Sequence, residues 1–552
     1  MRFIRRTFIS LAFIASLFIL FSFSSQFEMS KHLEIFVSVF KKLNAEYVDE
    51  VDSGELMRVG IDAMLKSLDP YTVYYSESEI EDYKTSISGE YGGIGSLIRS
   101  DSNYVIVTEP YENSPAAKAG LIAGDKIISV DGQSVRGKNA GDLSKLLKGT
   151  PGTGIKLVID RPYAGEINIE LTREKIKLKS VPYFDVREDG IAYIKLTRFT
   201  KKCGQEVKEA YTALAASNEI KGIVLDLRGN PGGLLNEAVN VTNTFIAKSE
   251  EVVYTQGRDI ETRKSYKTKL DAANDSTPLV VLINRNSASA SEIVSGTIQD
   301  LDRGLVVGER SYGKGLVQTT RPLVFNTQIK FTTAKYYIPS GRCIQELDYA
   351  HRDKKGKAIK VADSLRTQFT TKNGRIVYDG RGVMPDFIAS DSNLNNISIA
   401  LLRKNIIFDF VTLFRSKNDS IASAKSFEVN DALFNDFKAF IVGKDYSYET
   451  KTEKILAKLE KNTKVESYYT ALEEELRSLH DKLNLDKAND VDKFQAEIKQ
   501  LIKSEILTRY YFQKGKIIAG LSNDNYLEEA IRLIKDEDAY NALFKVDTIG
   551  VY

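Results

Sequence analysis

Ser289 and Lys314 have the surroundings that acyl transfer by a serine nucleophile requires. Ser289 follows the continuous apolar run 279–283 and precedes an amphipathic helical pattern, so it is predicted to lie at a helix N-terminus. Free backbone N–H groups and the helix dipole favour developing negative charge at that position. A serine hydroxyl is a poor nucleophile until a base takes its proton, so the site also needs a base.

A lysine is the best-placed base in this sequence. The usual base is histidine, but one histidine lies in a polar run with the pattern of an exposed loop, and two lie outside the predicted α/β region (His351, His32 and His480). A lysine can act instead when burial keeps its amine neutral. Lys314 stands between two glycines, which would let the backbone approach closely and bury the amine. Gln318 would then hydrogen-bond the lysine and orient it.

The same residues have simpler interpretations. Three serines of the turn could each be helix-capping residues: Ser287, Ser289 and Ser291. Taken alone, Lys314 would be a surface lysine. Glu292 is most simply a first-turn carboxylate that favours the helix dipole, and Arg228 a structural ion-pair former.

Residues 308–314 also fit the P-loop pattern of a glycine, four residues, glycine and lysine. A P-loop needs Ser or Thr next, for magnesium, and must begin a helix. Position 315 is glycine, and the run 316–320 has the pattern of a strand. The sequence therefore argues against an ATPase.

Composition excludes several other kinds of site. The formal net charge of +2 gives no support for a nucleic-acid partner. The histidines and the two cysteines form no cluster with metal-ligand spacing, so neither a metal nor another cofactor is predicted. Two buried free thiols, Cys203 and Cys343, are favoured over a disulfide between them, although that bond stays open.

The first residues have the pattern of an export signal. Arginines precede an apolar run from Phe8 to Phe23, which is short for a membrane span. No clear cleavage site follows, so an uncleaved membrane anchor stays open. We expect an exported protein of the bacterial periplasm or cell envelope.

Three motifs together resemble the C-terminal processing (tail-specific) protease family. Its nucleophile is the middle serine of a Ser-Ala-Ser-Ala-Ser-Glu run, here 287–292, and its base is the lysine of the run that here spans 312–318. The run Asp-Leu-Arg-Gly-Asn-Pro-Gly-Gly at 226–233 is similar to the loop that supplies one oxyanion donor. The resemblance covers about residues 31–393.

This resemblance implies a serine endopeptidase that works through an acyl-enzyme, with Ser289 as nucleophile and Lys314 as base. The oxyanion donors would be the backbone N–H of Gly232, with Gly233 as second choice, and that of Ala290. The core would adopt the crotonase-like (ClpP-like) α/β fold, and no cofactor is implied.

A second resemblance is to PDZ domains. The run Tyr91-Gly92-Gly93-Ile94-Gly95 resembles their carboxylate-binding loop, and the runs 114–121 and 124–132 resemble their later turns. Small residues leave backbone N–H groups free to bind a terminal carboxylate, while the peptide extends a sheet edge. Three leucines would line a pocket for an apolar last side chain, although core packing explains some of them: Leu143, Leu146 and Leu147. The implied substrates are proteins or peptides with free apolar C-termini, including envelope proteins that the enzyme would process or degrade.

The chain is thus predicted to be multidomain, with helical regions at both ends. Strand-like runs at 191–196, 223–227, 279–283 and 305–307 alternate with helical ones, which argues for an α/β core. The predicted divisions are an export signal or anchor at 1–26, a helical region at 27–88, a PDZ domain at 89–176, the α/β core at 177–393 and a helical region at 394–552.

The C-terminal region carries apolar stripes on charged helices. They comprise Leu472, Leu476, Leu479 and Leu483, and then Phe494, Ile498 and Leu501. Such stripes must be buried against each other, the core or a second copy of the chain. A helical domain that packs on itself is favoured, and the alternative is a homo-oligomer in which these helices control access to Ser289.

Overall fold

The computed structural model describes residues 27–545 except 188, 361 and 392, so the predicted export segment 1–26 lies outside the described residues. The chain forms two compact units, one of Met1–Ser78 with Gln318–Thr332 and one of Glu79–Val317 with Thr333–Tyr552. Within the described part, no helix is both long enough and apolar enough to span a membrane.

The first unit is mostly helical. A helix over residues 27–46 and α2 (Ser53–Lys66) confirm the helical pattern predicted there. The strand β1 (Val73–Tyr75) was not predicted; it is only three residues long and pairs antiparallel with residues 328–330, far along the chain. Apolar residues of the first helix are exposed, Leu33 by 63% and Phe36 by 48%.

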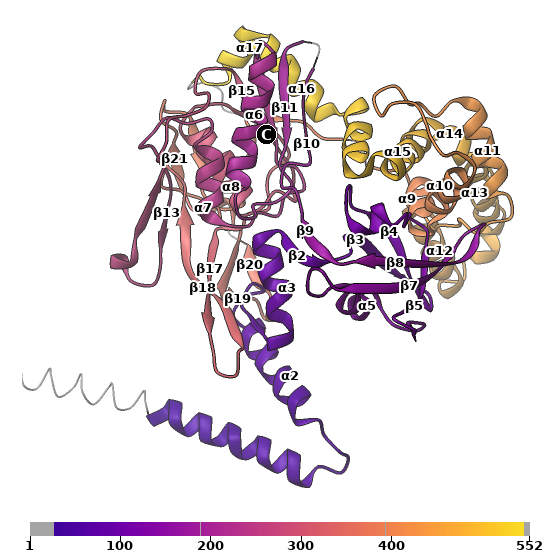
Figure 1. Ribbon diagram of the computed structural model, residues 1–552, viewed down its shortest axis with the longest axis horizontal. Coiled ribbons are helices and arrows are strands. Elements are labelled where there is room, and N and C mark those ends of the chain that lie inside the picture. The colour runs from indigo at the N-terminus through magenta and orange to yellow at the C-terminus, as the bar shows by residue number, and fades with distance from the viewer. Residues whose placement is uncertain (1–26, 188, 361, 392, 546–552) are drawn as a thin grey trace, which may run out of the picture. The chain divides into compact units, whose positions relative to one another are not determined.

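The segment that resembles a PDZ domain is a six-stranded sheet with two helices, α4 and α5, and the helix α3 precedes it. Its order is β3-β4-β5-β7-β8, with β6 added beside β5, so β3 is an edge strand (Figure 1). The strand β2, which precedes this sheet in the chain, pairs with β9, which follows it. The elements are α3 (Glu77–Ser88), β2 (Glu90–Gly93), β3 (Ser96–Asp101), β4 (Tyr104–Pro110), α4 (Pro115–Lys118), β5 (Lys126–Val130), β6 (Gln133–Ser134), α5 (Ala140–Leu147), β7 (Gly154–Arg161), β8 (Gly165–Thr172) and β9 (Glu174–Lys177).

A six-stranded sheet forms the α/β core. Its order is β10-β11-β12-β15-β16-β23, and every neighbouring pair is parallel except β10 with β11. The four predicted strands are confirmed as β11, β12, β15 and β16. The elements are β10 (Tyr183–Val186), β11 (Ile191–Lys195), α6 (Cys203–Ser217), β12 (Gly222–Asp226), α7 (Leu235–Thr242), β15 (Leu279–Ile283), α8 (Ala290–Asp300), β16 (Leu305–Gly308) and β23 (Phe387–Ile388).

Both faces of this sheet are buried, which explains its continuous apolar runs. Alternate residues such as Leu225 and Val281 pack with α6, α7 and α8 on one face. Their neighbours, such as Val224 and Leu282, pack with helices from the C-terminal region on the other. Because β12 and β15 are parallel, the helices that follow them begin at the same edge of the sheet.

The C-terminal region is helical, as predicted, and its last two helices return to the core. Helix α16 packs against β12, β15 and β16, and it lies with α17 beside the sheet in Figure 1. The approach is close, since a Cβ on Gly222 would lie 2.3 Å from Ile534 Cγ2. The helices are α9 (Asn396–Arg403), α10 (Ile406–Lys417), α11 (Asp431–Ile441), α12 (Lys451–Val465), α13 (Tyr469–Ala488), α14 (Asp490–Lys493), α15 (Gln495–Gly520), α16 (Asn525–Lys535) and α17 (Glu537–Ala542).

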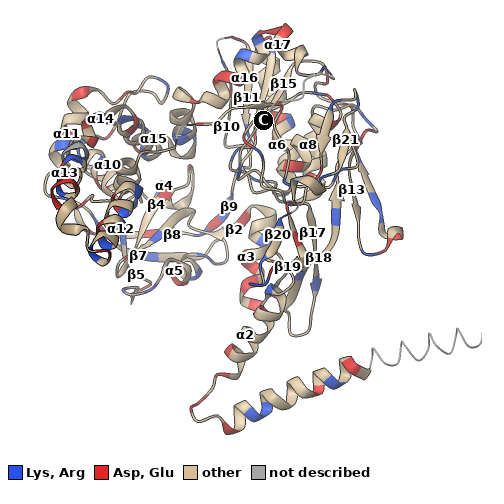
Figure 2. Cartoon of the chain, turned by 180° about the vertical axis from the view of Figure 1, so that it is seen from behind, with Lys and Arg blue, Asp and Glu red and all other residues tan. Residues whose placement is uncertain are grey.

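The predicted apolar stripes are only partly buried. Leu476 and Ile498 are buried, and Ile498 belongs to the cluster that also contains one face of the core sheet. Leu472 and Leu479 on α13 are exposed by 39% and 48%. Acidic and basic residues are both spread along the helices of this region (Figure 2).

The remaining strands form smaller pairings. In the second unit, β13 pairs with β14 and with residues 335–337 of β18. Two further hairpins pair β19 with β20 and β21 with β22. These strands are β13 (Glu251–Gln256), β14 (Lys264–Lys267), β17 (Leu316–Pro322), β18 (Gln328–Tyr337), β19 (Leu347–Arg352), β20 (Ala358–Lys360), β21 (Gln368–Thr370) and β22 (Ile376–Tyr378).

Both cysteines are free thiols. Cys203 is buried, as predicted, whereas Cys343 is half-buried. Burial raises the pKa of both thiols above the ordinary value.

Candidate active site

The turn between β15 and α8 holds Ser289 in an unusual backbone conformation. Its φ is 57° and its ψ is −112°, and α8 begins at the next residue, Ala290. A positive φ at a residue other than glycine costs about 1–3 kcal/mol and is concentrated at functional sites. The Ala290 N–H, in the first helical position, has no partner within the helix. The predicted placement of Ser289 at a helix N-terminus is confirmed.

The three serines of this turn do different things. Ser287 Oγ donates to the Leu227 carbonyl oxygen and Ser291 Oγ to the Asn230 carbonyl oxygen, both at 2.9 Å. These two hydroxyls therefore bind the neighbouring loop and do not cap the helix, which corrects the simpler interpretation. Ser289 is the N-cap of α8, and the Glu292 side chain accepts its backbone N–H, as in a capping box.

Glu292 connects the serine turn to the lysine loop. Its Oε2 accepts the backbone N–H of Ser289 at 2.7 Å and that of Lys314 at 2.9 Å. Its Oε1 accepts the Ser311 hydroxyl and the Gly313 N–H, each at 2.6 Å. Burial raises the pKa of the fully buried carboxyl, and these four donors oppose that shift. Glu292 is thus far more than the dipole-stabilising residue that its position in the sequence suggests.

The loop that carries Lys314 depends on its glycines. Gly313 has a φ of 87°, and a Cβ there would lie 2.7 Å from the Glu346 Cβ. A Cβ on Gly315 would lie 2.9 Å from the Gln345 nitrogen. Lys314 is half-buried, and the strand β17 follows, so the segment is not a helix-starting P-loop.

A second loop approaches Ser289 from β12. A Cβ on Gly232 would lie 2.8 Å from the Ser289 Cβ and 2.9 Å from the Ala290 nitrogen, so only glycine allows this contact. The Gly232 N–H donates to Asn230 Oδ1 at 2.9 Å. The Gly232 carbonyl oxygen accepts the Phe199 N–H at 3.0 Å. The Gly232 N–H therefore already has an acceptor, and the second choice, Gly233, becomes the candidate oxyanion donor to test beside Ala290.

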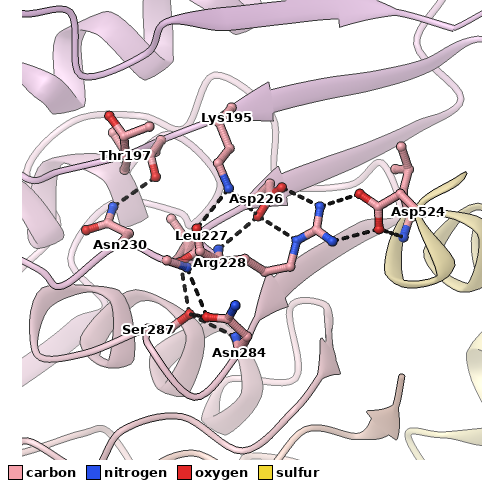
Figure 3. Close-up of polar contacts among 12 residues, drawn as sticks. Lys195, Thr197, Asp226, Leu227, Arg228, Asn230, Asn284, Ser287 and Asp524 are labelled. Atoms are coloured by element: carbon pink, nitrogen blue, oxygen red, sulfur yellow. Dashed lines mark hydrogen bonds and ion pairs between the residues drawn. The ribbon is translucent and has the colours of Figure 1, made fainter. Parts of the chain in front are cut away.

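Hydrogen bonds join this loop to the serine turn, as Figure 3 shows in part. The Gly229 N–H donates to Asn284 Oδ1 at 2.9 Å, and the Ala288 N–H donates to the Asn230 carbonyl oxygen at 3.0 Å. With the two serine contacts described above, they make one hydrogen-bonded assembly of the two loops. The sequence motifs contain these residues but do not indicate that they bond to each other.

Gln318 belongs to the first unit, whereas Lys314 belongs to the second. Its Nε2 donates to Thr332 Oγ1 at 3.1 Å. Its predicted role in orienting Lys314 stays a prediction. Tyr336, which sequence reasoning missed, donates its hydroxyl to the Ser289 carbonyl oxygen at 3.2 Å.

The predicted carboxylate-binding loop joins β2 to β3. Gly92 and Gly93 belong to β2, and Ile94 and Gly95 are buried. A Cβ on Gly92 would lie 2.1 Å from the Gly149 carbonyl oxygen, which accounts for glycine there.

The three leucines proposed for the peptide pocket belong to the core of this domain. Leu143 and Leu147 lie in its buried cluster, and Leu146 packs against it partly buried. Core packing therefore explains them. Among the described residues, no group of His, Cys, Asp and Glu side chains is arranged to hold a metal ion.

Comparison with known protein families finds three matching regions. Residues 190–350 match peptidase family S41, and residues 106–161 match the PDZ domain. Residues 397–534 match the family described as the C-terminal helical domain of a probable PDZ-protease.

Individual relatives are similar over much of the chain. A carboxy-terminal-processing protease of Bartonella bacilliformis is 39% identical over 320 residues, which are 57% of this chain and 73% of the relative. A probable CtpA-like serine protease of Staphylococcus aureus is 34% identical over 371 residues, which are 66% of this chain and 70% of the relative. Among solved structures, the photosystem II D1 C-terminal processing protease is 27% identical, with a TM-score of 0.35, over 64% of this chain and 92% of that one.

Proposed function

Because the chain belongs to peptidase family S41 and is a serine-type peptidase with a PDZ domain, we propose that it processes protein C-termini with Ser289 as nucleophile and Lys314 as general base. The observation that carries this assignment is the shared oxygen of Glu292. It accepts the backbone N–H groups of both residues, so nucleophile and base are neighbours in space.

The reaction would proceed through an acyl-enzyme. Ser289 Oγ attacks the scissile carbonyl carbon while Lys314 Nζ takes its proton. The N–H groups of Ala290 and Gly233 stabilise the oxyanion of the tetrahedral intermediate. Its collapse breaks the C–N bond as Lys314 returns the proton to the leaving amine. Water then attacks the ester, with Lys314 again as base, and releases the acid and the free serine.

Substrate capture would use the PDZ domain. A peptide lying along the edge strand β3 would place its terminal carboxylate at the loop formed by Gly92, Gly93, Ile94 and Gly95. The substrates are then proteins with free apolar C-termini, and Gln318 would orient Lys314 during cleavage.

Four further parts of the proposal concern the fold, the cellular setting, the substrates and the assembly. The parallel strands β11, β12, β15 and β16, with helices between them, support the crotonase-like (ClpP-like) fold. The basic and apolar pattern of residues 1–26 supports export to the periplasm or cell envelope, with or without anchoring in the membrane. Envelope proteins are then the substrates. Exposed apolar residues such as Leu33 support a homo-oligomer.

Covalent labelling tests the assignment of the nucleophile. We expect Ser289→Ala and Lys314→Ala each to abolish peptide cleavage, because nucleophile and base act as one unit. A fluorophosphonate, which reacts with activated serines, should label the wild-type chain at Ser289. Ser287→Ala is the matched control: it loses a contact to Leu227 but keeps the nucleophile, so it should still be labelled. Cleavage by purified Ser289→Ala above the contaminant level would refute the mechanism.

A further inference from the structure

Arg228 lies buried between the loop after β12 and the start of α16, as Figure 3 shows. Its side chain is 13% exposed, and those of Asp226 and Asp524 are 1% and 5% exposed. Towards the core, its Nε and Nη2 donate to the two carboxylate oxygens of Asp226 at 3.1 and 2.7 Å. Towards α16, its Nη1 and Nη2 donate to the two oxygens of Asp524 at 2.6 and 2.5 Å. The guanidinium is therefore held from both sides.

Asp524 is itself fixed by its helix. It is the N-cap of α16, and its Oδ1 also accepts the Leu527 N–H at 3.1 Å. The ring of Tyr526 covers Arg228, with the guanidinium carbon 4.8 Å from the ring centre. Because α16 packs firmly on the core sheet, the Asp524 carboxylate approaches Arg228 from a rigid element.

Arg228 is part of the loop that meets the nucleophile. Its backbone N–H donates to Asp226 Oδ1 at 2.8 Å, so side chain and backbone are tied to one carboxylate. The residues on either side of it, Leu227 and Gly229, bond to Ser287 and Asn284 of the serine turn. A movement of Arg228 would thus be passed to the turn that presents Ser289 and to the proposed oxyanion donors that follow.

We infer that Asp524 is a positioning residue for the peptidase reaction, through which α16 holds the Arg228 loop in its catalytic geometry. The inference rests on the proposed function of that site. Without Asp524, the buried guanidinium would keep only one of its two bidentate partners, Asp226, and would reorient towards water. Oxyanion stabilisation depends on donors that are already in place, so a small displacement of the loop lowers the rate.

The variant Asp524→Ser separates this role from helix capping. Serine is also a favoured N-cap, so α16 keeps its start, but its short side chain carries no charge for Arg228. With an internally quenched peptide that ends in a free apolar residue, we expect kcat to fall about 10²-fold, as for a misplaced reacting group, with KM changed less than about twofold. Should Asp524→Ser not fold, Asp524→Asn, which also caps and nearly preserves the shape, is measured against the same criteria.

Tyr540→Phe is the matched control in the same C-terminal layer. The Tyr540 hydroxyl accepts the Leu279 N–H at 3.0 Å and donates to the Leu279 carbonyl oxygen at 2.9 Å, at the start of β15 and away from the serine turn. The Tyr540→Phe substitution should lower the melting temperature but leave kcat within about twofold of the wild type. The double variant of Asp524→Ser with Arg228→Gln should be no slower than Arg228→Gln alone, because both changes remove one interaction.

The outcomes are distinct. A folded Asp524 variant with wild-type kcat, an equal loss of kcat in Tyr540→Phe, or additive effects in the double variant would each overturn the inference. If Ser289→Ala cleaves the peptide, the proposed function fails. If Ser289→Ala is inactive while Asp524→Ser is fully active, only the positioning role fails.

Discussion

The carboxylate of Glu292 shows how much one buried side chain can organise. It accepts four donors, and among them are the backbone N–H groups of the two residues to which we assign the chemistry. Each of these donors would cost about 1–3 kcal/mol if it were left buried without an acceptor. The geometry of Ser289 relative to Lys314 therefore depends on an ionisable group that is itself fully buried.

We expect Glu292→Gln to lower kcat about 10²-fold, since the amide can accept with only one oxygen and turns its own N–H groups towards buried donors. The rate of fluorophosphonate labelling measures the effect on Ser289 directly. Asp300→Asn is the control: Asp300 lies buried at the other end of α8 and pairs with Arg342 at 2.7 Å. It should lose stability but keep the labelling rate. Labelling of Glu292→Gln at the wild-type rate would contradict this account.

Among the elements, the edge strand β3 and the loop before it are the parts to which we assign substrate capture. An edge strand presents unpaired backbone groups, and peptide addition to such an edge is a common mode of recognition. Leu143 and Leu147 pack in the domain core, so only the partly buried Leu146 remains of the three leucines first proposed for the pocket of a last side chain. Recognition through the peptide backbone and carboxylate is therefore the part of the proposal to test.

Amidation of the substrate C-terminus tests tail capture. We expect kcat/KM to fall about tenfold for the amidated form of the quenched peptide, because the loss of a charge-assisted hydrogen bond costs ~1.5 kcal/mol. N-terminal acetylation of the same peptide, which leaves the carboxylate intact, should have no effect. Equal rates for the free acid and the amide would show that the enzyme does not select substrates by their terminal carboxylate.

At the scale of the whole molecule, the helical C-terminal region is not an appendage of the α/β core. One face of the core sheet, with residues such as Val224 and Leu282, is buried by helices from this region. In contrast, the hairpin of α12 and α13 buries Leu456 and Leu476, which belong to none of the three core clusters. The region thus combines a layer of the core with a separable hairpin.

Two deletions should therefore behave differently. A chain that ends at residue 393 should aggregate and lose activity, because it exposes an apolar sheet face and lacks Asp524. Replacement of residues 451–488 by a short Gly-Ser linker should leave a folded and active enzyme. Tyr448 bonds to both Lys487 and Asp490, so the two ends of the hairpin are close. For both deletion variants, size-exclusion chromatography measures aggregation, thermal melts measure stability and fluorophosphonate labelling measures activity. A soluble, active chain ending at 393 would show that α16 is dispensable.

The sequence by itself determined four strands of the α/β core, the serine at a helix start and the glycine-flanked lysine. These features are local, because apolar runs, capping positions and backbone freedom are properties of neighbouring residues. It did not reveal that Ser287 and Ser291 bind the loop after β12, that Glu292 joins two motifs, or that Asp524 reaches Arg228. The sequence also did not indicate the short strand β1, which pairs with residues 328–330 far along the chain. These features come from contacts between residues far apart in the chain, and a buried polar group is satisfied by whichever donor or acceptor the fold brings to it.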